Sequence, residues 1–323
     1  MITHASTLPL AATAAVPAMS NRILALGLTT LTLGGAGCGS GEPEPPAREH
    51  VAFVSNRDGN FDIYLLDVPT GEVTNLTADP GMDYGFSWSP DGDRIAFMSD
   101  RDGNRELYSM GVPDGALVRL TTDDSRDGSP DWSPDGSHIV FASNRDSDSG
   151  EIYVMASDGS DVQRVTVNER YEEVPAFSPD GRYVAFGAVA PFEEGAEPTL
   201  QIFRLDLETG EELQLTHLAG HNSAPRWSPD GSTIAFYGQV GPGFDGANLL
   251  VMASDGSDLQ NVTDDAEPDW QPDWSPDGSR LVFARGPSDP LDLWIIGAEG
   301  GEMTPLEVAD GRDEQPKWRP VPR

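Results

Sequence analysis

The sequence predicts an all-β protein, a six-bladed β-propeller of four-stranded antiparallel blades, on the basis of a repeated phrase, its period and the apolar triplet that follows it. The phrase aromatic-Ser-Pro-Asp-Gly occurs five times, and a degenerate sixth copy reads Trp-Arg-Pro. Its leading aromatic residues are Trp88, Trp132, Phe177, Trp227, Trp274 and Trp318. Their spacings of 44, 45, 50, 47 and 44 residues match the period of a propeller blade. Triplets such as Ile95-Ala-Phe97 follow the phrase, as expected where sheets stack face to face.

The repeat at residues 88–121 shows the expected order of elements within one blade. The first strand ends at Trp88, and a turn follows in which Pro90 fixes φ and Gly92 supplies a positive φ. The alternation of apolar segments and polar turns then predicts three more strands, at residues 95–97, 106–110 and 117–121. Each period therefore makes one four-stranded antiparallel blade.

The two ends of the repeat region predict how the ring closes. The region begins with a second strand at Val51-Ala-Phe53 and ends with a first strand at Trp318. We therefore expect strands near 51–55 and 315–319 to lie in the same sheet, which removes the open ends of the array. The propeller domain is expected at residues 50–319, followed by a short tail at 320–323.

Residues 1–37 have the pattern of an export signal peptide, in which an apolar run at 23–33 follows Asn21-Arg22 and leads into small residues. Met19 is an alternative start. The apolar run has 11 residues, too few to cross a bilayer. The segment resembles a bacterial lipoprotein signal, although Gly35 stands where such signals usually have leucine. That resemblance implies a lipid on Cys38, with plain secretion and an uncleaved anchor as alternatives.

The residues after Cys38 indicate how the domain is held. Residues 38–49 contain three prolines and no apolar period, which predicts a flexible tether. Gly39 lies where inner-membrane retention signals carry aspartate, so the chain is expected on the periplasmic side, anchored to the outer membrane. Cys38 is the single cysteine, which excludes an intrachain disulfide.

The charge of the chain restricts its partners. Fifty-four acidic and 20 basic side chains give a formal net charge of −34. Such a charge repels nucleic acids and anionic lipid surfaces at long range, so we expect no nucleic-acid partner and membrane contact only through the lipid. Cations and basic proteins are the partners that this charge favours, and the acidity also suits a protein that must remain soluble in a salty environment.

The repeat resembles a known family. The pattern W-S-P-D-G-x-x-I-A-F, with S-[ND]-R-D-G-N and third strands such as Asp62-Ile-Tyr64, is similar to the WD40-like (PD40) repeat of TolB-type propellers of bacterial envelopes. The resemblance covers residues 50–319. It implies the fold and an envelope location, whereas one scaffold of this kind can host many activities.

The two faces of the predicted propeller differ in sequence. The Pro-Asp-Gly and Asp-Gly turns of one face are nearly identical in every blade, which suggests a structural role. The second turns of the other face vary, with long examples at residues 190–199 and 241–246. Because varied loops on a rigid scaffold often build binding sites, we expect a protein or glycan partner at this second face.

A set of polar residues recurs five positions before each aromatic: Asp83, Asp127, Glu172, Asn222, Asp269 and Asp313. They are expected to form a ring at the mouth of the central channel. Three readings remain open: each side chain caps its own loop, the ring attracts a cationic partner or substrate, or it binds Ca²⁺ or Mg²⁺, which prefer oxygen ligands.

Three arginines, Arg57, Arg101 and Arg145, recur on the same face in successive blades. They are expected to form ion pairs with the ring or with neighbouring aspartates on one half of the propeller. The alternative is a bidentate site for a carboxylate or sulfate ligand.

Signals for catalysis are weak. The sequence has no G-x-S-x-G motif, and no catalytic residue is predicted. The nearest metal-binding pattern is His217-Leu-Ala-Gly-His221, in a predicted loop, and some propeller lyases that resemble this family use histidine-held metal. The sequence favours a monomeric, non-enzymatic binding or scaffold propeller without a cofactor. The alternatives are a metal-dependent hydrolase or lyase at the channel mouth and a purely architectural lipoprotein.

Overall fold

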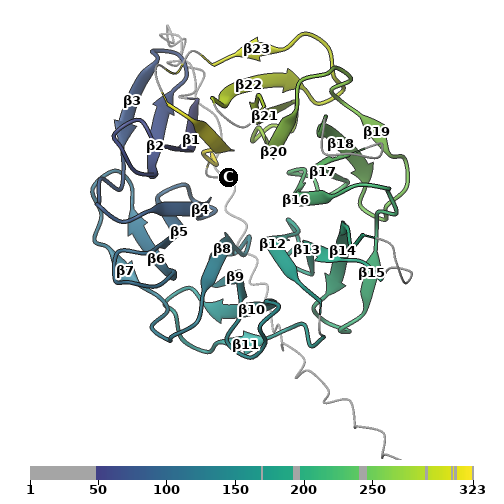
Figure 1. Cartoon of the computed structure of the whole chain (residues 1–323). Helices are drawn as coiled ribbons and strands as arrows, with labels where there is room; N and C mark the ends of the chain where they lie inside the picture. Colours follow the sequence, from purple (N-terminus) through teal and green to yellow (C-terminus); the bar gives the residue numbers. More distant parts are fainter. Residues whose placement is uncertain are drawn as a thin grey trace, which may run out of the picture.

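The computed structural model describes residues 49–321, except 169, 192–196, 240–245, 288–289, 307 and 309–310. The expected signal peptide, Cys38 and nearly all of the tether lie outside the described residues. The described chain forms six four-stranded sheets around a central axis (Figure 1). All strand pairs are antiparallel, which confirms the predicted fold class.

Each blade runs from an inner strand at the channel to a short outer strand at the rim. The inner strands are β24 (Asp313–Trp318), β4 (Asp83–Trp88), β8 (Asp127–Trp132), β12 (Glu172–Phe177), β16 (Asn222–Trp227) and β20 (Asp269–Trp274). The second strands are β1 (His50–Ser55), β5 (Arg94–Ser99), β9 (His138–Ser143), β13 (Tyr183–Val189), β17 (Thr233–Gly238) and β21 (Arg280–Arg285). The third strands are β2 (Asp62–Asp67), β6 (Glu106–Gly111), β10 (Glu151–Ala156), β14 (Leu200–Asp206), β18 (Asn248–Ala253) and β22 (Asp292–Gly297). The outer strands are β3 (Glu72–Asn75), β7 (Val118–Arg119), β11 (Gln163–Arg164), β15 (Glu212–Gln214), β19 (Gln260–Asn261) and β23 (Thr304–Pro305).

The ring closes as the sequence predicts. Strand β24 pairs with β1, so that Val51 lies opposite Trp318 and Ser55 opposite Asp313. Both Val51 and Trp318 are buried. The last strand thus completes the first blade, which then has four strands like the other five.

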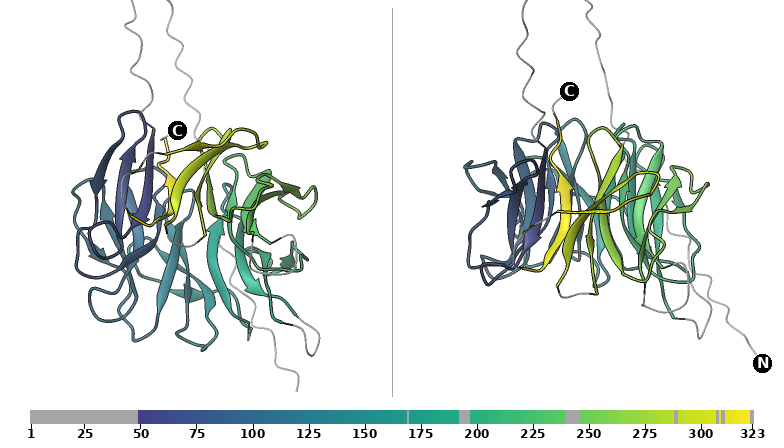
Figure 2. Two further views of the ribbon diagram at one scale, coloured as in Figure 1. Left: turned by 45° about the horizontal axis from the view of Figure 1, so that its top comes forward. Right: turned by 90° about the horizontal axis from the view of Figure 1, so that it is seen from above.

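The repeated Ser-Pro-Asp-Gly phrase forms a self-bonded turn. In the first copy the Ser89 hydroxyl donates to Asp91 at 2.5 Å, and the Arg94 amide donates to the Ser89 hydroxyl at 2.9 Å. Gly92 adopts a φ of 72°, which glycine tolerates best. The other four copies make the same bonds. We call the side of the propeller that carries these turns the turn face and the opposite side the loop face; Figure 2 shows the strands running between the two.

Two of the leading tryptophans of the phrase hydrogen-bond to the preceding blade. The Trp227 indole donates to the carbonyl of Ala176 at 3.2 Å, and the Trp274 indole donates to that of Arg226 at 3.0 Å. Each bond reaches from one inner strand to the preceding one. Between the sheets, six phenylalanines of the second strands are completely buried: Phe53, Phe97, Phe141, Phe186, Phe236 and Phe283.

Every inner strand carries a bulge in its middle, where one residue has a positive φ: Gly85, Ser129, Val174, Ala224, Gln271 and Gln315. Two of these residues bond around the channel. The Gln271 side chain accepts the Gln315 amide at 3.1 Å, and the Gln315 side chain accepts the Gly85 amide at 2.9 Å. The bulges therefore turn backbone and side-chain groups toward neighbouring blades and shape the channel wall.

Candidate functional site

The six polar residues predicted as a channel-mouth ring are the first residues of the six inner strands, and all six are buried. In two blades an arginine of the second turn binds the ring carboxylate through both oxygens. Nη2 of Arg101 lies 2.9 Å from each oxygen of Asp83, and Arg145 makes the same pair of contacts with Asp127. These bonds occupy the oxygens that a cation would need.

The three predicted arginines lie in three successive blades and have similar surroundings. Arg57 donates to Asp313 at 2.8 Å. The Arg101 guanidinium lies 5.5 Å from the Phe97 ring centre and 5.1 Å from that of Tyr108. Arg57 and Arg145 contact the equivalent phenylalanine and tyrosine rings. Each arginine is thus held by cation–π contacts and a buried carboxylate, so these bonds account for the S-[ND]-R motif as a clamp within the blade.

The other three members of the ring have different partners. Glu172 accepts hydrogen bonds from Thr166 at 2.5 Å and Asn168 at 2.6 Å. The Asn222 amide donates to the carbonyl of Gly220 at 2.9 Å. Asp269 accepts from Arg285 at 2.8 Å, while its Oδ2 atom has no hydrogen-bond partner among the described residues. A ligand role for the ring stays a prediction, and burial together with these bonds weighs against it.

Replacing Asp269 with asparagine is expected to change how stability depends on pH. Burial, opposed by Thr263 and Arg285, raises the pKa of Asp269 from 3.8 to about 6. The folded chain then holds a proton that the unfolded chain releases, so the stabilisation is complete below pH 3.8 and is lost as the pH rises through 6. The free energy of unfolding of Asp269→Asn, minus that of the wild type, should rise by about 2 kcal/mol between pH 4 and 6.5. Urea unfolding across this range measures the difference, and a flat difference would contradict the expectation.

The two histidines predicted as metal ligands lie in the connection that leads to β16. His217 is exposed, and Nδ1 of His221 accepts the amide of Leu200 at 3.2 Å. Within the part of the chain that the structure describes, no three His, Cys, Asp or Glu side chains form a group that could hold a metal ion. Metal binding through His217 and His221 stays a prediction. No helix among the described residues has the length and apolarity needed to cross a membrane.

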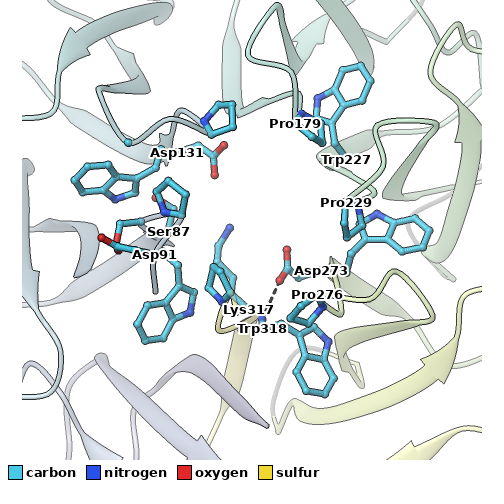
Figure 3. A pocket seen from close by; sticks show the side chains of 18 of the residues that line it. Ser87, Asp91, Asp131, Pro179, Trp227, Pro229, Asp273, Pro276, Lys317 and Trp318 are labelled. Atoms are coloured by element: carbon cyan, nitrogen blue, oxygen red, sulfur yellow. Dashed lines mark hydrogen bonds between the residues drawn. The ribbon is translucent and has the colours of Figure 1, made fainter. Parts of the chain in front are cut away.

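A large cavity opens on the turn face, at the centre of the ring. This cavity, which we call the funnel, has a volume of about 840 Å³. Its wall consists mainly of the aromatic and proline residues of the repeated phrase: Trp88, Trp132, Trp227, Trp274, Trp318, Pro90, Pro134, Pro179, Pro229, Pro276 and Pro320 (Figure 3). Short, uniform turns leave the centre of this face uncovered. The sequence predicted only a structural role for the turn face and did not reveal this hollow.

The floor of the funnel is formed by the residues that directly precede the aromatic in the inner strands. Four of these positions are charged: Asp131, Arg226, Asp273 and Lys317. Arg226 lies 3.8 Å from Asp131, which also accepts the amide of Phe177 at 2.9 Å. Asp273 accepts the amide of Trp318 at 2.9 Å. The floor therefore combines two acids and two bases at positions equivalent in the fold.

The floor is also the neck of a longer channel. Arg226 and Lys317 line a second cavity of about 270 Å³ behind the funnel. Tyr84 and Gln315 connect that cavity with a third, of about 340 Å³, whose lining includes Asp148 of a second turn on the loop face. The charged floor thus lies between the openings on the two faces.

Lys317 differs from every other basic residue of the protein. It is the only lysine in the 323-residue sequence, and it is 8% exposed. Burial, together with the nearby charge of Arg226, lowers the pKa of Lys317 to about 7, although Asp273 and Asp131 oppose the shift. Burial also raises the pKa of Asp273. The sequence contains a signal for this residue, since its single lysine directly precedes a repeat aromatic. The pattern five positions before each aromatic, which predicted the channel-mouth ring, does not include it.

The rim of the funnel is acidic. Asp91 and Asp135 belong to the Pro-Asp-Gly turns and line the cavity. The hydrogen bond from Ser89 lowers the pKa of Asp91. Burial would raise the pKa of Asp135, but hydrogen bonds from Ser133 and Ser137 outweigh it and lower that pKa to about 2. The rim therefore carries negative charge from acidic to neutral pH.

Comparison with known proteins agrees with this architecture. Residues 46–193 and 174–322 match the family model described as PD40, TolB beta propeller domain. An uncharacterized protein of Agrobacterium fabrum (strain C58) is 33% identical over 139 residues, which is 38% of this chain and 45% of that protein. The matched stretch thus spans less than half the length of that relative.

Two solved structures illustrate the range of proteins with this fold. TolB from Acinetobacter baumannii superposes with a TM-score of 0.72 at 22% identity, covering 84% of this chain and 67% of TolB. An oligogalacturonate lyase in complex with manganese gives a TM-score of 0.52 at 18% identity, covering 82% of this chain and 73% of the lyase. At such identities the likeness concerns the fold alone.

Proposed function

Because the chain belongs to the family of TolB beta propeller domains, we propose that it is an exported, non-enzymatic propeller that binds a protein partner in the bacterial cell envelope through the funnel. The single observation that carries this proposal is the funnel itself. It is an opening of about 840 Å³ at the centre of a rigid ring of six sheets. Concave sites of this size on rigid scaffolds are the usual places for recognition.

The chemistry of the funnel favours a peptide segment over a glycan. Its five tryptophans are each less than a tenth exposed, so their faces offer little area for stacking a sugar ring. Prolines and aspartates form most of the accessible rim. A basic or neutral extended segment would meet complementary charge at the rim and a mixed pair of acids and bases at the floor.

The choice of face departs from the expectation based on variable loops. The cavity that Asp148 lines on the loop face has a volume of about 340 Å³, less than half that of the funnel. Much of the two longest second turns, at 190–199 and 241–246, lies outside the described residues. The loop face therefore remains the alternative docking face, and the experiment below distinguishes the two.

The location forms part of the same proposal. The sequence similarity to TolB propellers and the apolar run at residues 23–33 support export to the periplasmic side of the envelope. A lipid on Cys38 would hold the domain at the outer membrane through the tether at residues 38–49.

Photo-crosslinking in living cells tests the proposed docking face. A photoreactive residue at Pro134, on the funnel rim, should give one discrete adduct, whereas the same residue at Val118, on the exposed outer strand β7, should not. Asp91→Asn with Asp135→Asn should reduce the Pro134 adduct by about tenfold, because two rim charges are removed. The matched pair Asp158→Asn with Asp255→Asn changes Asp-Gly turns outside the funnel and should leave the adduct unchanged.

Two outcomes would contradict the proposal. An adduct obtained only from a photoreactive residue at Asp148, which lines the cavity on the loop face, would support the face that the sequence predicted. No adduct from any position would favour a purely architectural protein.

The enzymatic alternative depends on the likeness in fold to the manganese-bound lyase. It requires metal binding that depends on the histidines. Calorimetric titration of Mn²⁺ into the wild type and into His221→Ala would reveal stoichiometric heat that the substitution abolishes if this alternative holds, and equal heats if it does not.

A further inference from the structure

We propose that Lys317 is a nucleophilic amine that forms an imine with a small neutral aldehyde entering the funnel. This inference goes beyond the proposed function, because docking a peptide segment requires no covalent chemistry. It would make the floor of the funnel a covalent ligand site in a protein without a recognised catalytic motif.

The position of Lys317 provides the first support. The side chain lies at the neck of the funnel, and Figure 3 shows it pointing into the opening between the carboxylates of Asp131 and Asp273. Its charged neighbours are Arg226, Asp273 and Asp131, which act on the amine electrostatically. The residue is almost fully buried and lines the funnel, so its amine faces a cavity instead of open solvent.

The surrounding charges provide the second support, because only a neutral amine has the lone pair needed to attack a carbonyl carbon. Burial and the charge of Arg226 on β16 lower the pKa of Lys317, while Asp273 on β20 and Asp131 on β8 oppose this effect. Further out, Asp91, Arg94 and Asp135 line the same funnel. A substantial share of Lys317 is therefore neutral near pH 7. Lysine, unlike arginine, can lose its proton in this way.

The neighbours also supply groups for the reaction. Arg226 and Ser87 line the funnel, and Nη1 of Arg226 and Oγ of Ser87 are buried polar atoms without a hydrogen-bond partner among the described residues. The positive charge of Arg226 would stabilise the negative charge that develops on a carbonyl oxygen bound there. Asp273, whose pKa burial raises, can hold and deliver a proton.

The reaction balances without an oxidant or reductant. The lone pair of Lys317 forms a bond to the aldehyde carbon, and the π electrons of the C=O bond move to the oxygen, which takes a proton as the nitrogen loses one. The resulting carbinolamine loses its hydroxyl group as water, with a proton from Asp273. The nitrogen lone pair then completes the C=N bond, and the nitrogen returns its remaining proton to Asp273. One amine and one aldehyde give one imine and one water.

The class of ligand follows from the shape and charge of the funnel. Its volume of about 840 Å³ admits small organic molecules. Its acidic rim and the net charge of −34 disfavour anionic carbonyl compounds such as 2-oxo acids. Short neutral aldehydes are therefore the expected ligands.

Reductive trapping of the full chain tests the inference with glyceraldehyde as the probe and cyanoborohydride as the trapping reagent. The single lysine makes the result unambiguous, because only the amino terminus competes and peptide mapping separates the two. At pH 7 the folded chain should be modified at Lys317 at least about tenfold faster than the same chain unfolded in urea, since its amine is more often neutral. Anionic glyoxylate should react more slowly than glyceraldehyde.

Two variants complete the test. Lys317→Arg should abolish the modification outside the amino terminus. Arg226→Met, which removes the cation that favours the neutral amine, should lower the rate at pH 7 several-fold and shift the pH profile of the rate upward. If circular dichroism shows that Arg226→Met does not fold, the pH dependence of the modification rate in the wild type is the deciding measurement. Equal rates in folded and unfolded chains, or a rate that rises only near pH 10 as for an ordinary lysine, would overturn the inference. The photo-crosslinking result does not depend on this amine, so the two proposals can fail separately.

Discussion

Deleting residues 311–323 is expected to abolish cooperative folding of the propeller. The deletion removes β24, the inner strand of the first blade, and leaves the inner edge of β1 without its partner. It also removes Trp318, which is 4% exposed and packs with Val51 and Val282. Loss of a buried tryptophan alone typically costs about 3–5 kcal/mol. The total stability of a domain is about 5–15 kcal/mol, so losing the strand as well should exceed what the ring can tolerate.

Circular dichroism during thermal unfolding measures this effect. A matched deletion of residues 320–323 retains all of β24 and should keep a sharp transition. If the chain lacking 311–323 melted as sharply as the full chain, and at the same temperature, closure by the two terminal segments would not contribute to stability.

The fold could be predicted from the sequence because the residues of each repeat specify its turn locally. Pro90 and Gly92 specify one turn by their backbone preferences alone, and the same turn recurs at a fixed period. The repeat region begins with a second strand at Val51 and ends with a first strand at Trp318. The last strand therefore had to pair with the first to complete the first blade. The backbone preferences of the turns, the period of the repeat and the pairing of the two ends all indicate the same propeller. A fold can be predicted from sequence when these levels agree.

The candidate site could be predicted only in part, because it depends on what the blades leave open at the axis. Asp83 and its equivalents could be identified as a set because they recur five positions before each aromatic. The sequence does not show that these side chains are buried or that arginine side chains bind some of them. Lys317 and Asp273 occupy equivalent positions with opposite charges, so they break the repeat instead of following it. A search for recurring residues therefore passes over them, although they lie next to each other on the neighbouring inner strands β24 and β20.

Replacing Arg101 with methionine is expected to destabilise the protein by about 3–5 kcal/mol, because it leaves a buried carboxylate without its partner. Asp83 is completely buried, and Arg101 donates to both of its oxygens. Methionine keeps much of the packing against Phe97 and Tyr108 while removing the charge. Urea unfolding at pH 7 measures the loss. Arg182→Met breaks an ion pair with Asp206 whose arginine side chain is 47% exposed, and it should cost much less stability than Arg101→Met.

A second substitution and the pH dependence separate loss of the ion pair from loss of packing. Adding Asp83→Asn to Arg101→Met removes the uncompensated charge and should recover most of the lost stability. Burial raises the pKa of Asp83 even in the wild type, where Arg101 opposes the shift. Without Arg101 the folded state should hold the proton more tightly, so the variant should gain stability below the unfolded pKa of 3.8 and lose it as the pH rises. If Arg101→Met were equally destabilised at pH 4 and pH 7, and the double variant recovered nothing, the clamp would act through packing of its side chain against the two rings and not through its charge.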